Sequence, residues 1–127
     1  MAHRPLLIGV TVLTSHSGRD LGEIGLPEDP DAQAALLARL VKEAGLDGVV
    51  CSAREASRLR AEHGDGFCLV TPGIRPAGSD RGDQERVVTP LDAIRQGAHY
   101  LVIGRPITQA ADPVTVLAGI NHELLLT

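Results

Sequence analysis

The sequence predicts a parallel α/β fold in which strands and helices alternate along the chain. Four short runs rich in Val, Ile and Leu are each followed by a segment that carries helix start and stop signals. Short apolar runs of this kind are typical of strands in a parallel sheet. The order of elements fits an open sheet and half of a closed barrel equally well. We expect a single domain over residues 1–127.

The first strand is expected over residues 6–13. The helix that follows it starts with Asp29 as N-cap and Pro30 at the first helical position, both of which are favoured there. Gly45 is the expected stop. Apolar residues at helical spacing predict the buried stripe of this helix as Ala32, Leu36, Leu40 and Ala44.

The second strand is expected over residues 48–51. Ser52 and Glu55 stand three residues apart at the start of the next helix, which is the spacing of a capping box. This helix is expected to run to about Glu62 and to end at Gly64.

The last two strands are expected over residues 67–70 and 100–103. Between them, Thr89 and the following proline open a helix that Gly97 ends. Asp112, again followed by proline, opens the final helix. The buried stripe expected for this last helix is Val116, Ile120 and Leu124.

Composition restricts the kinds of partner that the chain can have. The net charge is -4, whereas general nucleic-acid binding needs a basic face that displaces counterions from phosphates. No apolar run approaches the roughly 18 residues that span a membrane. These features predict a soluble, cytoplasmic domain that binds neither nucleic acid nor membrane.

Cysteine and histidine give no sign of a metal or redox site. Cys51 and Cys68 have the spacing of neither a zinc knuckle nor a redox pair, so we expect buried free thiols. The five histidines lack paired ligand spacing, and we expect no metal. Only His16 follows a strand closely enough to face a site, and a solvated loop histidine is the favoured interpretation there.

Two arginines follow the last two strands and point to an anion site. Arg75 comes a few residues after the third strand, and Arg105 lies in the turn after the fourth. Because parallel strands carry their binding loops at their carboxyl ends, the two guanidinium groups could converge on one phosphate by charge-assisted hydrogen bonds. Gly104 has no side chain, so a phosphate could approach its backbone closely.

The loop between residues 72 and 86 is long for a compact domain, which favours a binding role. Its remaining charges also have an ordinary explanation, namely pairing within a solvated loop. We prefer that explanation for Asp80, Arg81, Asp83, Glu85 and Arg86.

A family resemblance covers most of the chain. The segments TPGIRPAGSDRGDQERVVTPLDAIRQGA and YLVIGRPIT, together with VTVLTS near the start, closely resemble the C-terminal part of orotidine 5'-phosphate decarboxylases. The resemblance runs from about Leu7 to Leu124. It implies the C-terminal half, (β/α)4, of a TIM (β/α)8 barrel of the ribulose-phosphate-binding type, with the N-terminal half absent, since a whole barrel needs about 250 residues.

The resemblance also implies a ligand and the residues that contact it. The family removes the carboxylate of orotidine monophosphate to give UMP and carbon dioxide, without metal or organic cofactor. Arg75, Gln84, Gly104 and Arg105 match the family's phosphate and ribose contacts position by position. Thr14 matches a contact to the pyrimidine edge, and we interpret the adjacent Ser15 as a structural turn residue.

The catalytic centre of the family has no counterpart in this sequence. The resemblance implies a lysine flanked by aspartates, Asp-x-Lys-x-x-Asp, which would stabilise and protonate the carbanion that decarboxylation leaves. Lys42 is the only lysine, and it lies near the end of an outer helix, where we expect it to be solvated. We therefore assign no catalytic residue and expect the chain to be inactive alone.

Two functions remain open from the sequence. In the first, the chain supplies the substrate-binding half of a decarboxylase for orotidine monophosphate in pyrimidine synthesis. In the second, it is a non-catalytic half-barrel that binds phosphate or nucleotides. A half-barrel has two unpaired strand edges and an uncovered apolar face, so we expect it to associate with copies of itself or with a missing N-terminal half.

Overall fold

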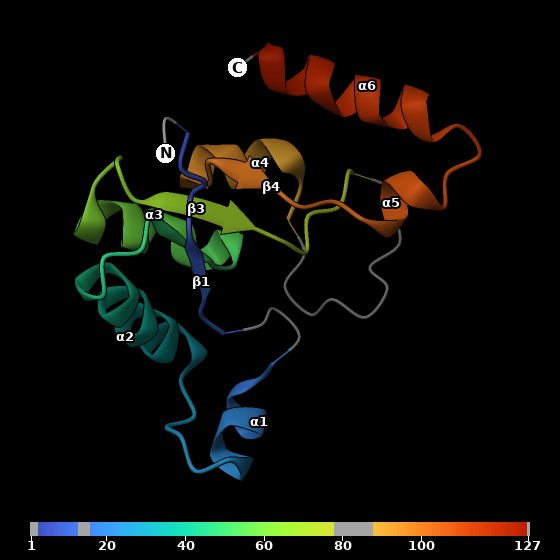
Figure 1. Ribbon diagram of the computed structural model, residues 1–127. Helices are drawn as coiled ribbons and strands as arrows, with labels where there is room; N and C mark the ends of the chain where they lie inside the picture. Colours follow the sequence, from blue (N-terminus) through green and yellow to red (C-terminus); the bar gives the residue numbers. More distant parts are fainter. Residues whose placement is uncertain (1–2, 13–15, 78–87, 127) are drawn as a thin grey trace.

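The computed structural model describes residues 3–12, 16–77 and 88–126 and confirms the predicted order of strands and helices (Figure 1). Four parallel strands form one sheet in the order β1-β2-β3-β4. Their bounds are β1 Ile8–Val10, β2 Gly48–Val50, β3 Cys68–Thr71 and β4 Tyr100–Leu101. Consecutive strands are neighbours throughout, as in a barrel wall.

The predicted start and stop signals set the ends of four helices. Their bounds are α2 Pro30–Glu43, α3 Ala53–His63, α4 Pro90–Gln96 and α6 Pro113–Leu125. Asp29, Thr89 and Asp112 each accept a backbone N–H from the first turn of the helix that they precede. The carboxylate of Glu55 accepts the N–H of Ser52 at 2.9 Å. Gly97 ends α4 with φ of 116°, a left-handed conformation that favours glycine.

Two short helices were not expected from the sequence. One is α1, Gly18–Glu23, in the connection between β1 and α2. Ser17 caps it, since its hydroxyl accepts the Asp20 N–H at 3.3 Å. The other is α5, Arg105–Thr108, which occupies the turn predicted after the fourth strand.

Helices α2, α3 and α4 cover one face of the sheet, and the core lies between them (Figure 1). Strand side chains that point to this face are buried, among them Val49 and Leu69, both with no exposed area. Gly9 also points this way, and a Cβ there would lie 2.6 Å from the Val41 side chain of α2. The close approach of helix to strand therefore depends on glycine. The central cluster of buried residues is Ala38, Val49, Cys51, Ala56, Leu59, Phe67 and Leu69.

The predicted buried stripe of α2 was wrong. Ala32, Leu36, Leu40 and Ala44 are all exposed, and the buried residues of this helix are Ala34, Ala35 and Ala38. Small side chains face the sheet because the helix lies close to Gly9 and to α3. The stripe predicted for α6 is confirmed: Ile120 is buried, and Val116 and Leu124 are half-buried.

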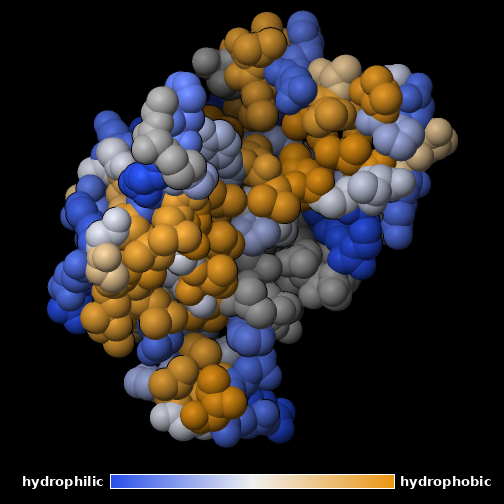
Figure 2. Space-filling view, viewed as in Figure 1, coloured by the Kyte–Doolittle hydropathy of each residue, from blue (hydrophilic) through white to orange (hydrophobic). Residues whose placement is uncertain are grey.

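The opposite face of the sheet has no helix over it in the described part of the chain. Val10, Val50, Val70 and Tyr100 lie side by side across the four strands. Val10 and Tyr100 are 58% and 60% exposed. Viewed from this side, apolar side chains gather over the strands and toward α6 (Figure 2). This confirms the uncovered apolar face expected from the sequence.

An ion pair holds the start of β1 against the rest of the sheet. Asp47 accepts hydrogen bonds from the Arg4 guanidinium at 2.6 and 3.0 Å and from the Leu7 N–H at 2.7 Å. The Arg4 contact and the Leu7 N–H hold the pKa of Asp47 below its usual range. The backbone N–H of Asp47 also donates to the Leu7 carbonyl. One residue thus binds the edge strand by side chain and backbone.

Acid titration should detect this contact. A carboxyl group with a lowered folded-state pKa stabilises the fold above its unfolded pKa of about 4, and that stabilisation is lost as pH falls through the folded pKa. We expect Asp47→Asn to reduce the slope of stability against pH below about pH 4. The slope will not vanish, because the pKa values of Asp20, Asp65 and Asp112 are also lowered. Urea unfolding midpoints between pH 2 and 7 measure the effect, and an unchanged acid slope would contradict it.

Candidate phosphate-binding site

Strand β3 and the segment after it position Arg75. The chain leaves the sheet at Thr71 and turns at Gly73, whose φ of 75° favours glycine. Ile74 is then buried and forms a parallel bridge with Val88. The Arg75 N–H donates to the Val88 carbonyl at 3.0 Å. This bridge fixes the backbone from which the Arg75 side chain extends.

Strand β4 positions Arg105 beside it. The Val102 N–H donates to the Thr71 carbonyl at 2.9 Å, so the two chains stay paired up to their carboxyl ends. Gly104 follows, and its carbonyl accepts the N–H groups of Ile107 and Thr108 at the start of α5. Arg105 is the first residue of that short helix.

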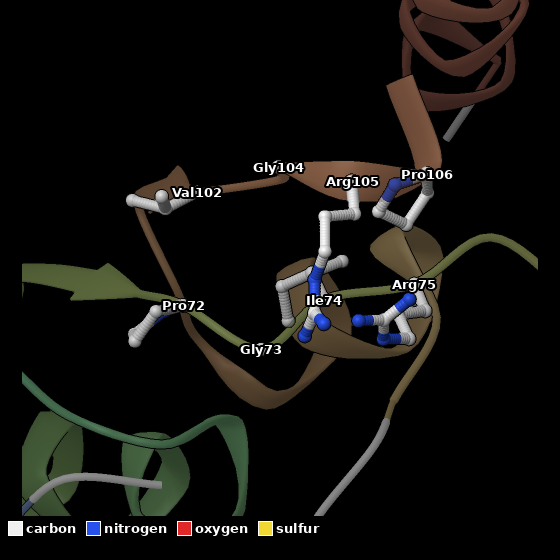
Figure 3. A pocket seen from close by; sticks show the side chains of 8 residues that line it. All are labelled: Pro72, Gly73, Ile74, Arg75, Val102, Gly104, Arg105 and Pro106. Carbon is white, nitrogen blue, oxygen red and sulfur yellow. The ribbon is translucent and has the colours of Figure 1, made fainter. Parts of the chain in front are cut away.

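The two arginines line one pocket of about 200 Å³ at the carboxyl ends of β3 and β4 (Figure 3). Both side chains point into it, Arg75 from the segment after β3 and Arg105 from the segment after β4. The described residues that line it are Pro72, Gly73, Ile74, Arg75, Val102, Gly104, Arg105 and Pro106. None of these described residues is acidic, and two of them are arginines. Their positive charge favours an anion.

Burial and open space suit the pocket to a phosphate. Arg75 is only 7% exposed, so its guanidinium is largely removed from water and a bound anion would be weakly screened. A Cβ built on Gly104 meets nothing within 4 Å, so the space beside its backbone is open. Arg75, Gly104 and Arg105, predicted as site residues, are thus brought together. Thr14, Ser15 and Gln84 lie outside the described residues, as do the loop charges from Asp80 to Arg86.

The residues that support the site were harder to predict from the sequence. Ile74 and Val88 were not expected to pair, although Val88 belongs to an apolar pair just before the Thr89 cap. Apolar residues on both sides of a long loop are a weak signal that its ends lie together.

The other candidates from the sequence lie away from this pocket. His16 is exposed and lines a separate hollow of about 300 Å³ with Asp29 and Arg54, at the starts of α2 and α3. Lys42 is exposed, as expected, but its ammonium also donates to the His63 carbonyl at 2.9 Å and lies 5.9 Å from the centre of the Phe67 ring. It therefore ties α2 to the end of α3. No group of His, Cys, Asp or Glu within the described ranges is arranged to hold a metal ion.

Comparison with known proteins agrees with this geometry. The model of the "Orotidine 5'-phosphate decarboxylase / HUMPS family" matches residues 1–120. The chain belongs to this family. The orotidine 5'-phosphate decarboxylase of Vibrio parahaemolyticus is 64% identical over 121 residues, which are 95% of this chain and 52% of that protein. That of Hydrogenovibrio crunogenus is 60% identical over 123 residues and is likewise covered to 52%. The chain thus spans about half the length of the curated relatives it matches.

Solved structures give the same result. The orotidine 5'-phosphate decarboxylase of Lactobacillus acidophilus superposes with a TM-score of 0.74 at 40% identity, over 94% of this chain and 49% of that one. An uncharacterized conserved protein of Geobacillus kaustophilus superposes with a TM-score of 0.75 at 39% identity, over 95% and 49%. The fold is therefore about half of the TIM barrel of orotidine 5'-phosphate decarboxylases, as expected from the sequence. No helix among the described residues is long and apolar enough to cross a membrane.

The environment of Cys51 predicts an unreactive thiol. Burial, followed by the nearby Glu55 carboxylate, raises the pKa of Cys51 to about 12. We expect no alkylation of Cys51 by iodoacetamide at pH 8 in the folded chain, and full alkylation in urea. Peptide mass spectrometry measures both states of the same residue. Rapid labelling of Cys51 in the folded chain would show that this thiol is neither buried nor protonated.

Proposed function

We propose that this chain provides the substrate-binding half of an orotidine 5'-phosphate decarboxylase, which converts orotidine monophosphate to UMP and carbon dioxide. The observation that carries the proposal is the convergence of Arg75 and Arg105 on one pocket without an acidic residue in its described lining. The names of the relatives give the substrate. Two guanidinium groups match the charge of a phosphate dianion and can each donate two hydrogen bonds.

Within this proposal, each site residue has a defined role. Arg75 and Arg105 neutralise the phosphate, and Gly104 leaves room for it against the backbone. Gln84 donates to the phosphate or ribose, and Thr14 contacts the pyrimidine edge. Binding energy at the phosphate would hold the base and its carboxylate in place at a catalytic centre, which is how contacts remote from the reacting bond assist catalysis.

The reacting centre itself has to come from a second segment. Loss of carbon dioxide leaves a carbanion on the pyrimidine ring, and a positioned cation must stabilise and protonate it. The single lysine, Lys42, lies on α2 and binds the end of α3. We therefore propose that an Asp-x-Lys-x-x-Asp segment, in an N-terminal barrel half, completes the enzyme and that the chain alone is inactive.

The same observation about Lys42 favours a second candidate function. A half-barrel with a phosphate pocket and no catalytic lysine could act as a binding module for phosphate or nucleotides. The two functions differ in whether adding an N-terminal half produces decarboxylation of orotidine monophosphate. Mixing the chain with the separately produced N-terminal half of the Vibrio parahaemolyticus relative, and following loss of orotidine monophosphate, distinguishes them. Turnover only in the mixture supports the decarboxylase, and UMP binding without turnover supports the binding module.

Removal of Arg105 should weaken phosphate-dependent binding. We expect Arg105→Ala to reduce affinity for UMP by about tenfold or more, because a charged hydrogen bond contributes about 1.5–3 kcal/mol. Affinity for uridine, which has no phosphate, should be unchanged. Calorimetric titration of both ligands measures the difference.

Arg39→Ala is the matched control, since Arg39 is an exposed arginine on α2 that pairs only loosely with Glu43, at 3.9 Å. It should bind UMP like the parent chain. If Arg105→Ala also binds UMP like the parent, the phosphate assignment is wrong.

A further inference from the structure

The uncovered face of the sheet continues into both of its edges. Among the described residues, β1 pairs only with β2, and β4 pairs only with β3. Each outer strand therefore offers backbone donors and acceptors to a further parallel strand. The side chains beside these edges are apolar and exposed, including Leu6, Leu7 and Val10 at β1 and Tyr100 and Val102 at β4.

A groove beside β4 could accommodate another strand. Helix α6 packs on α4 and α5 and lies beside β4 (Figure 1). Between α6 and β4 is a hollow of about 290 Å³ whose walls include Leu101, Ile103, Leu117 and Leu124. A parallel strand added at the β4 edge would place its outward side chains under α6.

The β1 edge has the complementary feature. Side chains alternate along a strand, so Leu7 points to the helix-covered side with Gly9, while Leu6 points to the open side with Val10. Leu7 is nevertheless 59% exposed, because no described helix lies over that end of β1. The start of β1 has no described helix over it, and α6 extends over a hollow beside β4. These two features lie at opposite edges of the same sheet.

We propose that, when no N-terminal barrel half is supplied, a second copy of this chain covers the open face, so that two four-stranded halves close one eight-stranded parallel barrel. A two-fold axis along the barrel makes β4 of each copy pair with β1 of its partner, and both junctions form together. Each α6 then covers Leu7 of the other copy. The row Val10, Val50, Val70 and Tyr100 from both copies becomes the barrel interior, and all four edges are paired.

The geometry of an eight-stranded barrel fixes the register of these junctions. The shear of such a barrel is 8: following paired residues once around the barrel returns to the starting strand about eight residues nearer its start. With two-fold symmetry, each four-stranded half accounts for about four of these residues. Tyr100 lies in register with Val10 across the sheet of one copy. An offset of about four residues toward the start of β1 brings Tyr100 opposite Leu6 of the other copy. Both side chains point into the barrel.

This inference goes beyond the proposed function, because it concerns the chain without the N-terminal half, and native mass spectrometry tests it on the purified chain. We expect a dimer. Val10→Lys, which places a charge on an exposed residue of the open face, should give a monomer with an unchanged circular dichroism spectrum. Leu36→Lys is the matched control, since Leu36 is an exposed leucine on the helical side, and this variant should remain a dimer. A monomeric parent chain, or two variants that behave alike, would overturn the proposal.

Disulfide formation tests the register, including the case in which Val10→Lys does not fold. In the Leu6→Cys/Tyr100→Cys variant we expect a disulfide between positions 6 and 100 of different copies, identified as a linked peptide pair in a covalent dimer. Within one copy these positions stand on opposite edges, three strand spacings of about 4.8 Å apart, beyond the roughly 7 Å that a disulfide allows. Absence of the link under oxidising conditions would contradict the closed barrel.

A second occupant gives a different result. If the chain is monomeric and forms a one-to-one complex only when the N-terminal half of a family decarboxylase is added, that half covers the face and the self-closure proposal fails. UMP binding is measured separately in the Arg105 experiment. Loss of one proposal therefore leaves the other open to its own test.

Discussion

The parallel ladder between β3 and β4 is the interaction on which the site depends. It runs from the pair Val70 and Tyr100 to the hydrogen bond between the Val102 N–H and the Thr71 carbonyl. Because both strands point the same way, the chain leaves them at the same edge of the sheet, and the next residues carry Arg75 and Arg105. Two like charges are held at one pocket by this backbone pairing. Both guanidinium groups can donate hydrogen bonds to one anion, and so the ladder is what turns two separate arginines into a binding site.

The same sheet explains why the chain is incomplete as a barrel wall. Its helix-covered face is closely packed, with Val49, Leu69 and Ala38 fully buried. Its other face has a row of apolar side chains across all four strands, and the space beside α6 is hollow. One face of the sheet is therefore buried and the other is exposed, which is consistent with a chain that covers about half the length of the two solved structures it resembles.

Local signals made much of the fold predictable from the sequence. Each of the four longer helices is immediately preceded by the residue predicted as its N-cap: Asp29, Ser52, Thr89 or Asp112. A side-chain acceptor followed by proline, or one that belongs to a capping box, is strongly preferred at that position. The packing of α2 was not predictable in this way. Leu36 and Leu40 have the spacing of a buried stripe, yet alanines are the buried residues of α2, and Val41 of the same helix packs against Gly9 of β1. Which face of α2 is buried therefore depends partly on Gly9, a residue more than twenty positions earlier in the sequence.

The candidate site was predictable for a different reason. Arg75, Gly104 and Arg105 follow strands, so parallel topology alone brings them together, and the family resemblance added the ligand. The bridge between Ile74 and Val88 was not predicted, because it depends on how the ends of a long loop meet. Titration of the ¹⁵N-labelled chain with UMP tests the central claim most directly. We predict that amide shifts will concentrate at Gly73, Arg75, Gly104 and Arg105; shifts confined to other regions, or none at saturating UMP, would contradict the account.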